Sequence, residues 1–335
     1  MTDFRATVVG SYPRNVTVDD TMKKPSVSDE EALEMIRWAV KDQVALGLPI
    51  VGDGEGYREN MYWFYQKRMD GVSMENMQYK IFGDAGFGIE CARLVDKLGG
   101  TRWQLARKWK TARENAPANV QVKQTVTGPH MLARFTVNER PDLYPDDMAV
   151  ARAYTDVLEQ ELLEVIDAGC DYIQFDEPVW TLSPDESTWG AEVLNELIGR
   201  LPRVRFGLHV CGGNPHRKRV YFGKYTDMVE GFSKLKIDEL SLEHCTLHYN
   251  LMDLWESWDY KGDLTLGVID QRSDEIESPE VIWARTLPAL EYFGPDRLLL
   301  SSECGCGHVP LEITRAKMKV LCEACQQFRT EKRGR

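Results

Sequence analysis

Four side chains of the kind that binds soft metal ions stand in separate parts of the sequence. They are His209 and Cys211 in FGLHVCGGN, Glu243 in LSLEHC and Cys304 in SSECGCGH. Zinc accepts imidazole nitrogen, thiolate sulfur and carboxylate oxygen in tetrahedral geometry. His209 and Cys211 are two residues apart, so on a strand both side chains would point to the same side. This ligand set predicts a zinc site that can hold a thiol as its nucleophilic thiolate.

Other interpretations of these residues stay open. The His-x-Cys pair could be polar residues of a core, and Glu243 a surface acid. Cys245, Cys306 and His308 lie close enough in sequence to replace a ligand or to support one through a hydrogen bond. Four protein ligands would fill a tetrahedral site, so thiol binding requires one of them to leave. We expect Glu243 to be the ligand that is displaced.

The elements that must position these residues alternate between β-rich runs and amphipathic helical patterns. Ser28, three residues before Glu31, forms a capping-box pattern, and Gly169 stands where a helix would end. This alternation predicts an α/β fold, a single (β/α)8 TIM barrel over residues 1–335. A doubly wound sheet is the alternative, but the turn after the first strand, GSYPRN, lacks a G-x-G-x-x-G motif. Eight strands are predicted, at residues 6–11, 49–53, 121–126, 172–176, 204–209, 239–243, 264–269 and 297–301.

Polar residues recur where the predicted strands end, which in a barrel is the face that carries the active site. Residues 60–120 are long for one strand–helix unit, so we expect an insertion there that shapes the mouth of the barrel. The insertion begins with four consecutive aromatic residues, which suit either core packing or a surface for a corrinoid protein. These aromatic residues are Tyr62, Trp63, Phe64 and Tyr65.

The bulk composition points to a cytoplasmic enzyme. The net charge of −12 argues against a nucleic-acid or membrane surface, and the basic run HRKR at residues 216–219 is expected to be solvated. The apolar runs are too short to span a membrane, and the N-terminal residues do not resemble a signal peptide. Eight cysteines in such a chain favour metal binding or catalysis over disulfides. Cys91 and Cys170 lie among apolar neighbours and are expected in the core.

A series of motifs in the same order resembles the C-terminal catalytic barrel of cobalamin-independent methionine synthase, over about residues 7–325. The motifs are VGS at 9–11, DGEGYRENM at 53–61, TGP at 127–129, QFDEP at 174–178, HVC at 209–211, SLE at 241–243, GVID at 267–270 and the ECG around Cys304. The resemblance implies a zinc-dependent methyltransferase that acts on homocysteine and makes methionine.

The resemblance also implies roles for residues at the strand ends. The four residues of the opening paragraph match the zinc ligands of the family. Gly10 and Ser11 match the segment that holds the carboxylate of homocysteine, and Glu55 and Asp176 match the acids that hold its amino group. The chemistry agrees, because two carboxylates suit an ammonium, whereas backbone amides and a hydroxyl suit a carboxylate.

Asp270 and Arg272, in GVIDQRSDE, are the candidate catalytic residues. In the family a histidine, thought to serve acid catalysis when folate is the leaving group, stands where this chain has Arg272. Arg272 could be an anion clamp for a carboxylate, phosphate or sulfonate. It could equally be a surface arginine paired with Asp274 or Glu275.

The methyl donor is expected to differ from folate polyglutamate. The resemblance is to short members of the family, which implies a methyl-corrinoid protein or a methylated small molecule as donor. An acid that follows DEP in the family is replaced here by Trp180 and Thr181, which implies a more apolar pocket. The alternatives are an alkyltransferase acting on coenzyme M or another small thiol, a zinc-stabilised binding module without catalysis, and a decarboxylase of the uroporphyrinogen type.

Overall fold

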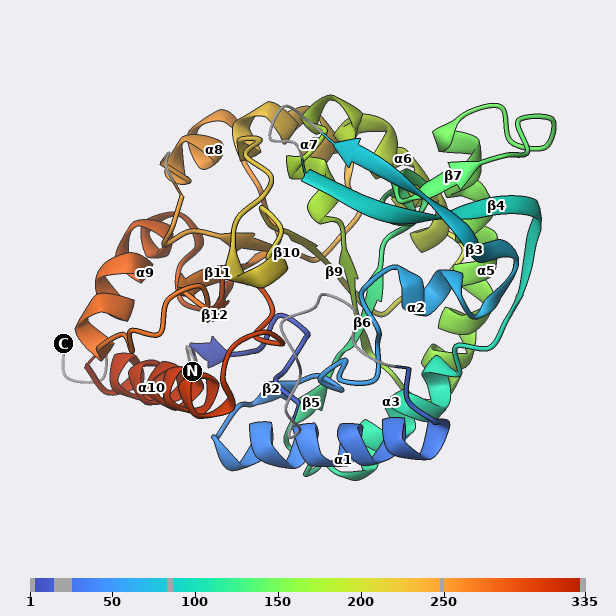
Figure 1. The fold of residues 1–335 in the computed structure, drawn as a ribbon. Coiled ribbons are helices and arrows are strands. Elements are labelled where there is room, and N and C mark those ends of the chain that lie inside the picture. Colours follow the sequence, from blue (N-terminus) through green and yellow to red (C-terminus); the bar gives the residue numbers. More distant parts are fainter. Residues whose placement is uncertain (1–3, 15–25, 83–86, 248–249, 332–335) are drawn as a thin grey trace.

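The computed structural model describes residues 4–14, 26–82, 87–247 and 250–331, which form an α/β protein with a curled parallel sheet (Figure 1). The strands of the curled sheet are buried almost throughout. Such burial is expected where helices cover the outer face of parallel strands. These strands are β1 (Arg5–Ala6), β2 (Ile50–Val51), β5 (Gln121–Val122), β6 (Gln124–Thr127), β8 (Tyr172–Asp176), β9 (Arg205–Val210), β10 (Glu239–Glu243), β11 (Asp263–Ile269) and β12 (Leu298–Ser302).

The parallel pairings run around the sheet and return to their start. β12 pairs with β1 on one side and with β11 on the other, and the series continues through β10, β9 and β8 to β6. Lys123 alone separates β6 from β5, which pairs with β2. A bridge between Thr7 and Ile50 connects β2 to the segment after β1. All eight predicted strands overlap these elements, and the predictions for β8 and β10 match their bounds.

Helices surround the curled sheet in Figure 1, and their ends follow local sequence signals. The Ser28 hydroxyl accepts the backbone N–H of Glu31 at 3.3 Å, and the Glu31 carboxylate accepts the N–H of Ser28 at 2.8 Å, which confirms the predicted capping box. Gly169 follows the fifth helix with a φ of +104°, which favours glycine. The helices are α1 (Asp29–Ala45), α3 (Leu105–Glu114), α4 (Pro129–Arg134), α5 (Asp147–Asp167), α6 (Ser187–Ile198), α7 (Val229–Lys234), α8 (Met252–Ser257), α9 (Pro279–Phe293) and α10 (Leu311–Glu331).

The insertion expected at residues 60–120 comprises fewer residues in the structure, because it ends with the hairpin that precedes α3. The short helix α2 (Trp63–Gln66) leads into an antiparallel hairpin of β3 (Met69–Phe82) and β4 (Phe87–Thr101), and β7 (Thr136–Asn138) pairs with β4 in parallel. Helix α3 belongs instead to the layer around the curled sheet, since it connects the hairpin to β5. The aromatic run packs mainly in the core, because Tyr62, Phe64 and Tyr65 are buried.

Short 3-10 helices follow several strands and complete the described fold. They are η1 (Pro178–Thr181), η2 (Pro184–Glu186), η3 (Pro215–Arg217) and η4 (Tyr225–Met228). Cys91 and Cys170 are buried, as predicted. Within the described ranges, no helix combines the length and the apolar character needed to cross a membrane.

Candidate metal centre and substrate pocket

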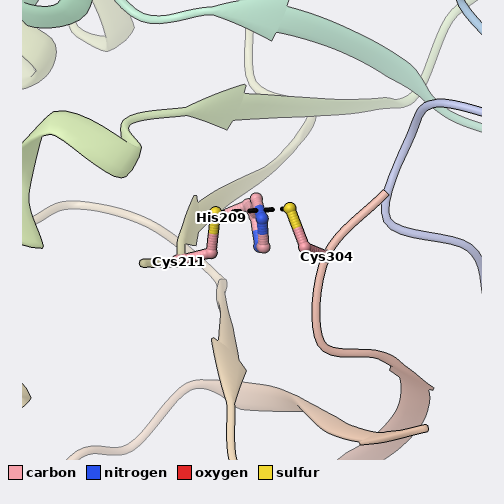
Figure 2. Close-up of side chains that lie close together, drawn as sticks. All are labelled: His209, Cys211 and Cys304. Carbon is pink, nitrogen blue, oxygen red and sulfur yellow. Dashed lines mark hydrogen bonds between the residues drawn. The ribbon is translucent and has the colours of Figure 1, made fainter. Parts of the chain in front are cut away.

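Three of the four predicted metal ligands meet at the C-terminal ends of β9 and β12. His209 lies on β9, Cys211 follows that strand, and Cys304 follows β12 (Figure 2). Their ligand atoms all lie within 4.8 Å of one another, and the two sulfur atoms are 3.4 Å apart. The two-residue spacing of His209 and Cys211 places both side chains on the same side, as expected where the extended backbone of a strand continues by one residue.

The histidine of this cluster has a nitrogen free to bind a metal. His209 Nδ1 lies 3.2 Å from the carbonyl oxygen of Ser241, so Nδ1 carries the proton and donates it. Nε2 is buried and has no hydrogen-bond partner among the described residues. Because a carbonyl fixes the tautomer in this way at many metal sites, Nε2 presents its lone pair to an ion.

The thiols of Cys211 and Cys304 contact each other, and this contact moves their pKa values in opposite directions. A hydrogen bond from the Cys211 thiol holds the pKa of Cys304 well below its usual range, and His209 lowers it further. The same contact, together with burial, raises the pKa of Cys211. A divalent cation would favour deprotonation of both sulfurs, and a donor set of one imidazole and two thiols fits zinc.

Glu243, the fourth predicted ligand, lies beside the cluster with its carboxylate held by two arginines. Its side chain is fully buried at the end of β10, and Oε1 accepts a hydrogen bond from Arg272 Nη2 at 2.5 Å. Oε2 accepts one from Arg219 Nη2. Glu243 is not among the three grouped ligands. Its role as a metal ligand therefore stays a prediction.

Arg219 corrects the prediction that HRKR at residues 216–219 is solvated. Its side chain is only 10% exposed because it reaches inward to Glu243. Arg217, two residues earlier, has a side chain that is 21% exposed and pairs with the exposed Asp274 at 2.7 Å. No local signal in the sequence distinguishes the two arginines.

One of the two interpretations of Arg272 was a surface arginine paired with Asp274 or Glu275. Within the described part of the chain, the structure shows neither pair and gives Glu243 and Glu303 as the partners of Arg272. Its Nη1 lies 3.1 Å from Glu303 Oε2, and its Nη2 also donates to the carbonyl of Gly213 at 2.9 Å. Glu303 is fully buried, and sequence reasoning did not assign it a role. Arg272 therefore joins the loop that follows Cys211 to the segment that carries Cys304.

Asp270 is not brought into the pocket described below. Its carboxylate accepts the backbone N–H of Arg272 at 2.8 Å, so it shapes the turn after β11. Trp180 and Thr181, expected to make the pocket more apolar, are buried and do not line it either. The Thr181 hydroxyl instead donates to the carbonyl of Cys211 at 2.6 Å, which helps to fix the position of that ligand.

A cavity of about 190 Å³ opens beside the three-ligand cluster. One part of its wall is polar and contains Ser11, Glu55 and Asp176. Another part is apolar and aromatic, and it includes residues of the region that precedes the hairpin. The apolar residues are Met61, Tyr62, Met131, Phe135, Pro178 and Tyr221.

The two predicted acids meet in the polar part of this cavity. Asp176 accepts a hydrogen bond from Gln174 Nε2 at 2.8 Å, and Gln174 in turn accepts one from Lys123 Nζ at 2.6 Å. Burial, and then the neighbouring Glu55, raise the pKa of Asp176 to about 7. A cation placed between the two carboxylates would stabilise both in their charged form.

Glu55 is held in place by contacts that the sequence did not reveal. Thr125 Oγ1 donates to Glu55 Oε1 at 2.5 Å, and Arg58 Nη1 lies 3.4 Å from the same oxygen. The backbone φ of Glu55, +54°, is uncommon for a residue other than glycine. The backbone N–H of Glu55 donates to the carboxylate of the buried Asp53 at 2.9 Å. A backbone conformation of this type is typical of functional sites.

Gly10 and Ser11 connect the N-terminal strand to both parts of the site. A Cβ on Gly10 would lie 2.3 Å from Glu55 Oε1, so any larger residue here would force the Glu55 carboxylate to shift. The Ser11 carbonyl accepts the N–H of Cys306 at 2.8 Å, and its hydroxyl accepts the N–H of Gly307 at 3.3 Å. Ser11 thus anchors the loop that carries the cysteine ligand from β12.

Cys245, Cys306 and His308, which were considered as alternative or supporting residues of the metal site, lie outside the three-ligand group. The Cys306 thiol lies 3.7 Å from the Ser302 hydroxyl, and burial raises its pKa to about 11. Cys245 follows β10, and burial raises its pKa well above the usual range. Neither belongs to the three-ligand group, whereas His308 lines the cavity.

Comparison with known proteins gives consistent matches over nearly the whole chain. The profile of the family described as "Cobalamin-independent synthase, Catalytic domain" matches residues 4–327. A methionine synthase of Saccharolobus islandicus (strain L.S.2.15 / Lassen #1) is 25% identical over 332 residues, which cover 97% of this chain and 95% of the relative. A methionine synthase of Sulfurisphaera tokodaii is 27% identical over 336 residues, covering 97% and 92%.

Solved structures share the fold at lower identity. A B12-independent methionine synthase from Shewanella sp. W3-18-1, in complex with selenomethionine, superposes with a TM-score of 0.87 and 22% identity, covering 99% of this chain and 100% of that chain. A methyltransferase from Methanosarcina mazei superposes with a TM-score of 0.62 and 16% identity, covering 98% and 95%. Because both identities are below 25%, these two matches show a shared fold only.

Proposed function

The chain belongs to the cobalamin-independent methionine synthase family through its catalytic domain, and we propose that it transfers a methyl group to the thiol of homocysteine to give methionine. The observation that carries the proposal is the placement of the three-ligand cluster and the acid pair on the walls of one cavity. We further propose that the curled sheet is a (β/α)8 barrel and that residues 1–335 form one catalytic domain.

The metal expected in the cluster is zinc. His209, Cys211 and Cys304 would hold it, with Glu243 as the fourth ligand that a thiol displaces. Zinc bound there would lower the pKa of the incoming thiol, so that a thiolate is available near neutral pH. The protein residues then orient the amino acid and bring the methyl donor in line with its sulfur.

The acceptor is an amino acid rather than a simple thiol. Glu55 and Asp176 are suited to its ammonium group, and the amides near Gly10 and Ser11 to its carboxylate. Two neighbouring carboxylates would repel the sulfonate of a thiol such as coenzyme M. The acid pair therefore favours homocysteine over the sulfonated alternative.

The donor side of the cavity favours an apolar methyl carrier. Among the described residues that line the cavity, Arg58 is the one arginine or lysine, and it is buried and paired with Glu55. A folate polyglutamate would bring several carboxylates that need basic partners. The apolar wall instead supports a methyl-corrinoid protein or a small methylated molecule as donor.

Zinc K-edge X-ray absorption of the purified protein, with and without homocysteine, tests the proposal. We expect the shell to change from the two protein sulfurs to three sulfurs when homocysteine is added. The same measurement with coenzyme M serves as the comparison. A change with coenzyme M alone would favour the alkyltransferase, and no change with either thiol would favour a structural metal.

A further inference from the structure

The carboxylate of Glu243 could bind either a metal ion or a pair of arginines. In the structure it binds the arginines. Both of its oxygens are occupied by guanidinium groups, Oε1 by Arg272 and Oε2 by Arg219. All three side chains are well buried: Glu243 is 0% exposed, Arg219 10% and Arg272 12%. A buried ion pair with this arrangement is a defined binding site for a carboxylate.

The surroundings of Glu243 make such a site necessary if the carboxylate leaves a metal. A fully buried ionised carboxylate without a cationic partner is strongly unfavourable, so a Glu243 carboxylate that leaves a metal needs another cation or a proton. Of the two arginines, Arg272 keeps a second acidic partner, Glu303 at 3.1 Å. Arg219 pairs with Glu243 and with no other acid among the described ion pairs.

We propose that Arg219 and Arg272 form a receiving site for the Glu243 carboxylate: with zinc held by the three grouped ligands, Glu243 would complete the site, and the two arginines would hold its carboxylate once a thiol takes its place. This inference rests on the proposed function. Glu243 exchanges one cationic partner for another, so the thiol does not have to compensate for an unpaired buried charge. The pair therefore increases the affinity for the thiol without touching it, and both arginines are positioning residues.

The receiving site is connected to the ligands on either side of it. Arg272 Nη2 contacts both Glu243 Oε1 and the carbonyl of Gly213, two residues after Cys211. Its Nη1 contacts Glu303, which immediately precedes Cys304. The Arg272 guanidinium is therefore tied to the segments next to both cysteine ligands, whereas Arg219 reaches Glu243 from the segment between Cys211 and η4.

Arg219→Gln is the first test, with Arg217→Gln as the matched control on the same loop. Arg217 pairs with Asp274 instead of Glu243, so its substitution should leave thiol binding unchanged. In Arg219→Gln we expect unchanged zinc stoichiometry and homocysteine binding about tenfold weaker. X-ray absorption should still show an oxygen ligand at homocysteine concentrations where the unmodified protein has lost it.

A second measurement needs no thiol. Removing zinc should lower the melting temperature of Arg219→Gln more than that of the unmodified protein, because the freed carboxylate then lacks one partner. In the Glu243→Gln background, Arg219→Gln should no longer weaken homocysteine binding, since no charge has to be received. Should Arg219→Gln fail to fold, Arg219→Lys provides the same comparison with the charge kept, and we expect an intermediate loss of affinity.

The outcomes separate this inference from the proposed function. If homocysteine adds a sulfur to the zinc shell of the unmodified protein but Arg219→Gln shows the same affinity and the same oxygen loss, the receiving site is wrong and the methyltransferase proposal stands. If homocysteine adds no sulfur to the unmodified protein, the proposed function itself is wrong.

Discussion

The sulfur atoms of Cys211 and Cys304 lie 3.4 Å apart although the two residues are 93 positions apart in the chain. Each cysteine follows the C-terminal end of its strand, β9 or β12, and two strands lie between these in the sheet. Their side chains therefore converge across the end of the curled sheet, which a flat sheet with the same strand order would not allow. The curvature of the sheet brings the ligand pair together.

Cys304→Ser should remove most of the bound zinc, because it deletes one of the three grouped ligands. We expect the melting temperature to fall by only a few degrees, since the large hydrophobic core does not depend on the metal. Metal analysis and circular dichroism check both expectations. Cys306→Ser is the control, and a comparable zinc loss in that variant would move the ligand assignment to Cys306.

Glu55→Gln should weaken homocysteine binding by about tenfold to a hundredfold, the range for hydrogen bonds that involve charged groups. The loss should be much smaller for 3-mercaptopropionate, a thiol acid without an amino group, because that ligand has no ammonium for Glu55 to contact. Calorimetric titration of both ligands measures the difference. Equal losses for the two thiols would contradict the assignment of Glu55 to the ammonium.

Gly10→Ala should disturb the acid pair, since the new methyl group would lie 2.3 Å from Glu55 Oε1. We expect loss of homocysteine binding of the same order as in Glu55→Gln. Gly52→Ala is the matched control, because the nearest side-chain atom to its Cβ, in Val8, is 4.0 Å away. Binding and thermal melting of the two variants are compared, and equal behaviour would argue against the close approach at Gly10.

Glu177 should make the protein less stable as pH rises. It accepts the N–H groups of His130 and Met131 at the start of α4, and burial raises its pKa to about 8. Between about pH 4.5 and 8 the folded state keeps a proton that the unfolded state has lost. The free energy of unfolding therefore decreases with rising pH in this window, by up to about 1.4 kcal/mol per pH unit from this group.

Glu177→Gln removes this contribution, because the amide does not titrate. Urea unfolding at pH 5, 6.5 and 8 should therefore show a flatter pH dependence for the variant than for the unmodified protein. Parallel curves for the two proteins would mean that Glu177 is ionised throughout this range.

Much of the fold was predictable because its signals are local. The capping box of Ser28 and Glu31 and the glycine after α5 involve residues a few positions apart, so short sequence windows contain them. The strands β8 and β10 are short runs bounded by polar residues, and their bounds were predicted correctly. The hairpin of β3 and β4 was not predicted as such, since its pairing is irregular, with several register shifts.

The sequence by itself determined which chemistry is possible: one imidazole, two thiols and a pair of carboxylates at the ends of parallel strands. Residue type and strand periodicity placed such side chains at one end of the sheet, because parallel strands bring their C-terminal ends to one side, and the resemblance to the family selected Glu55 and Asp176 as the acid pair. Only the tertiary structure decided which of two arginines on the HRKR run reaches Glu243, and that Arg272 turns toward Glu303 instead of solvent. Such pairs join loops from different strands, and burial decides which charges need partners, so no local pattern specifies them.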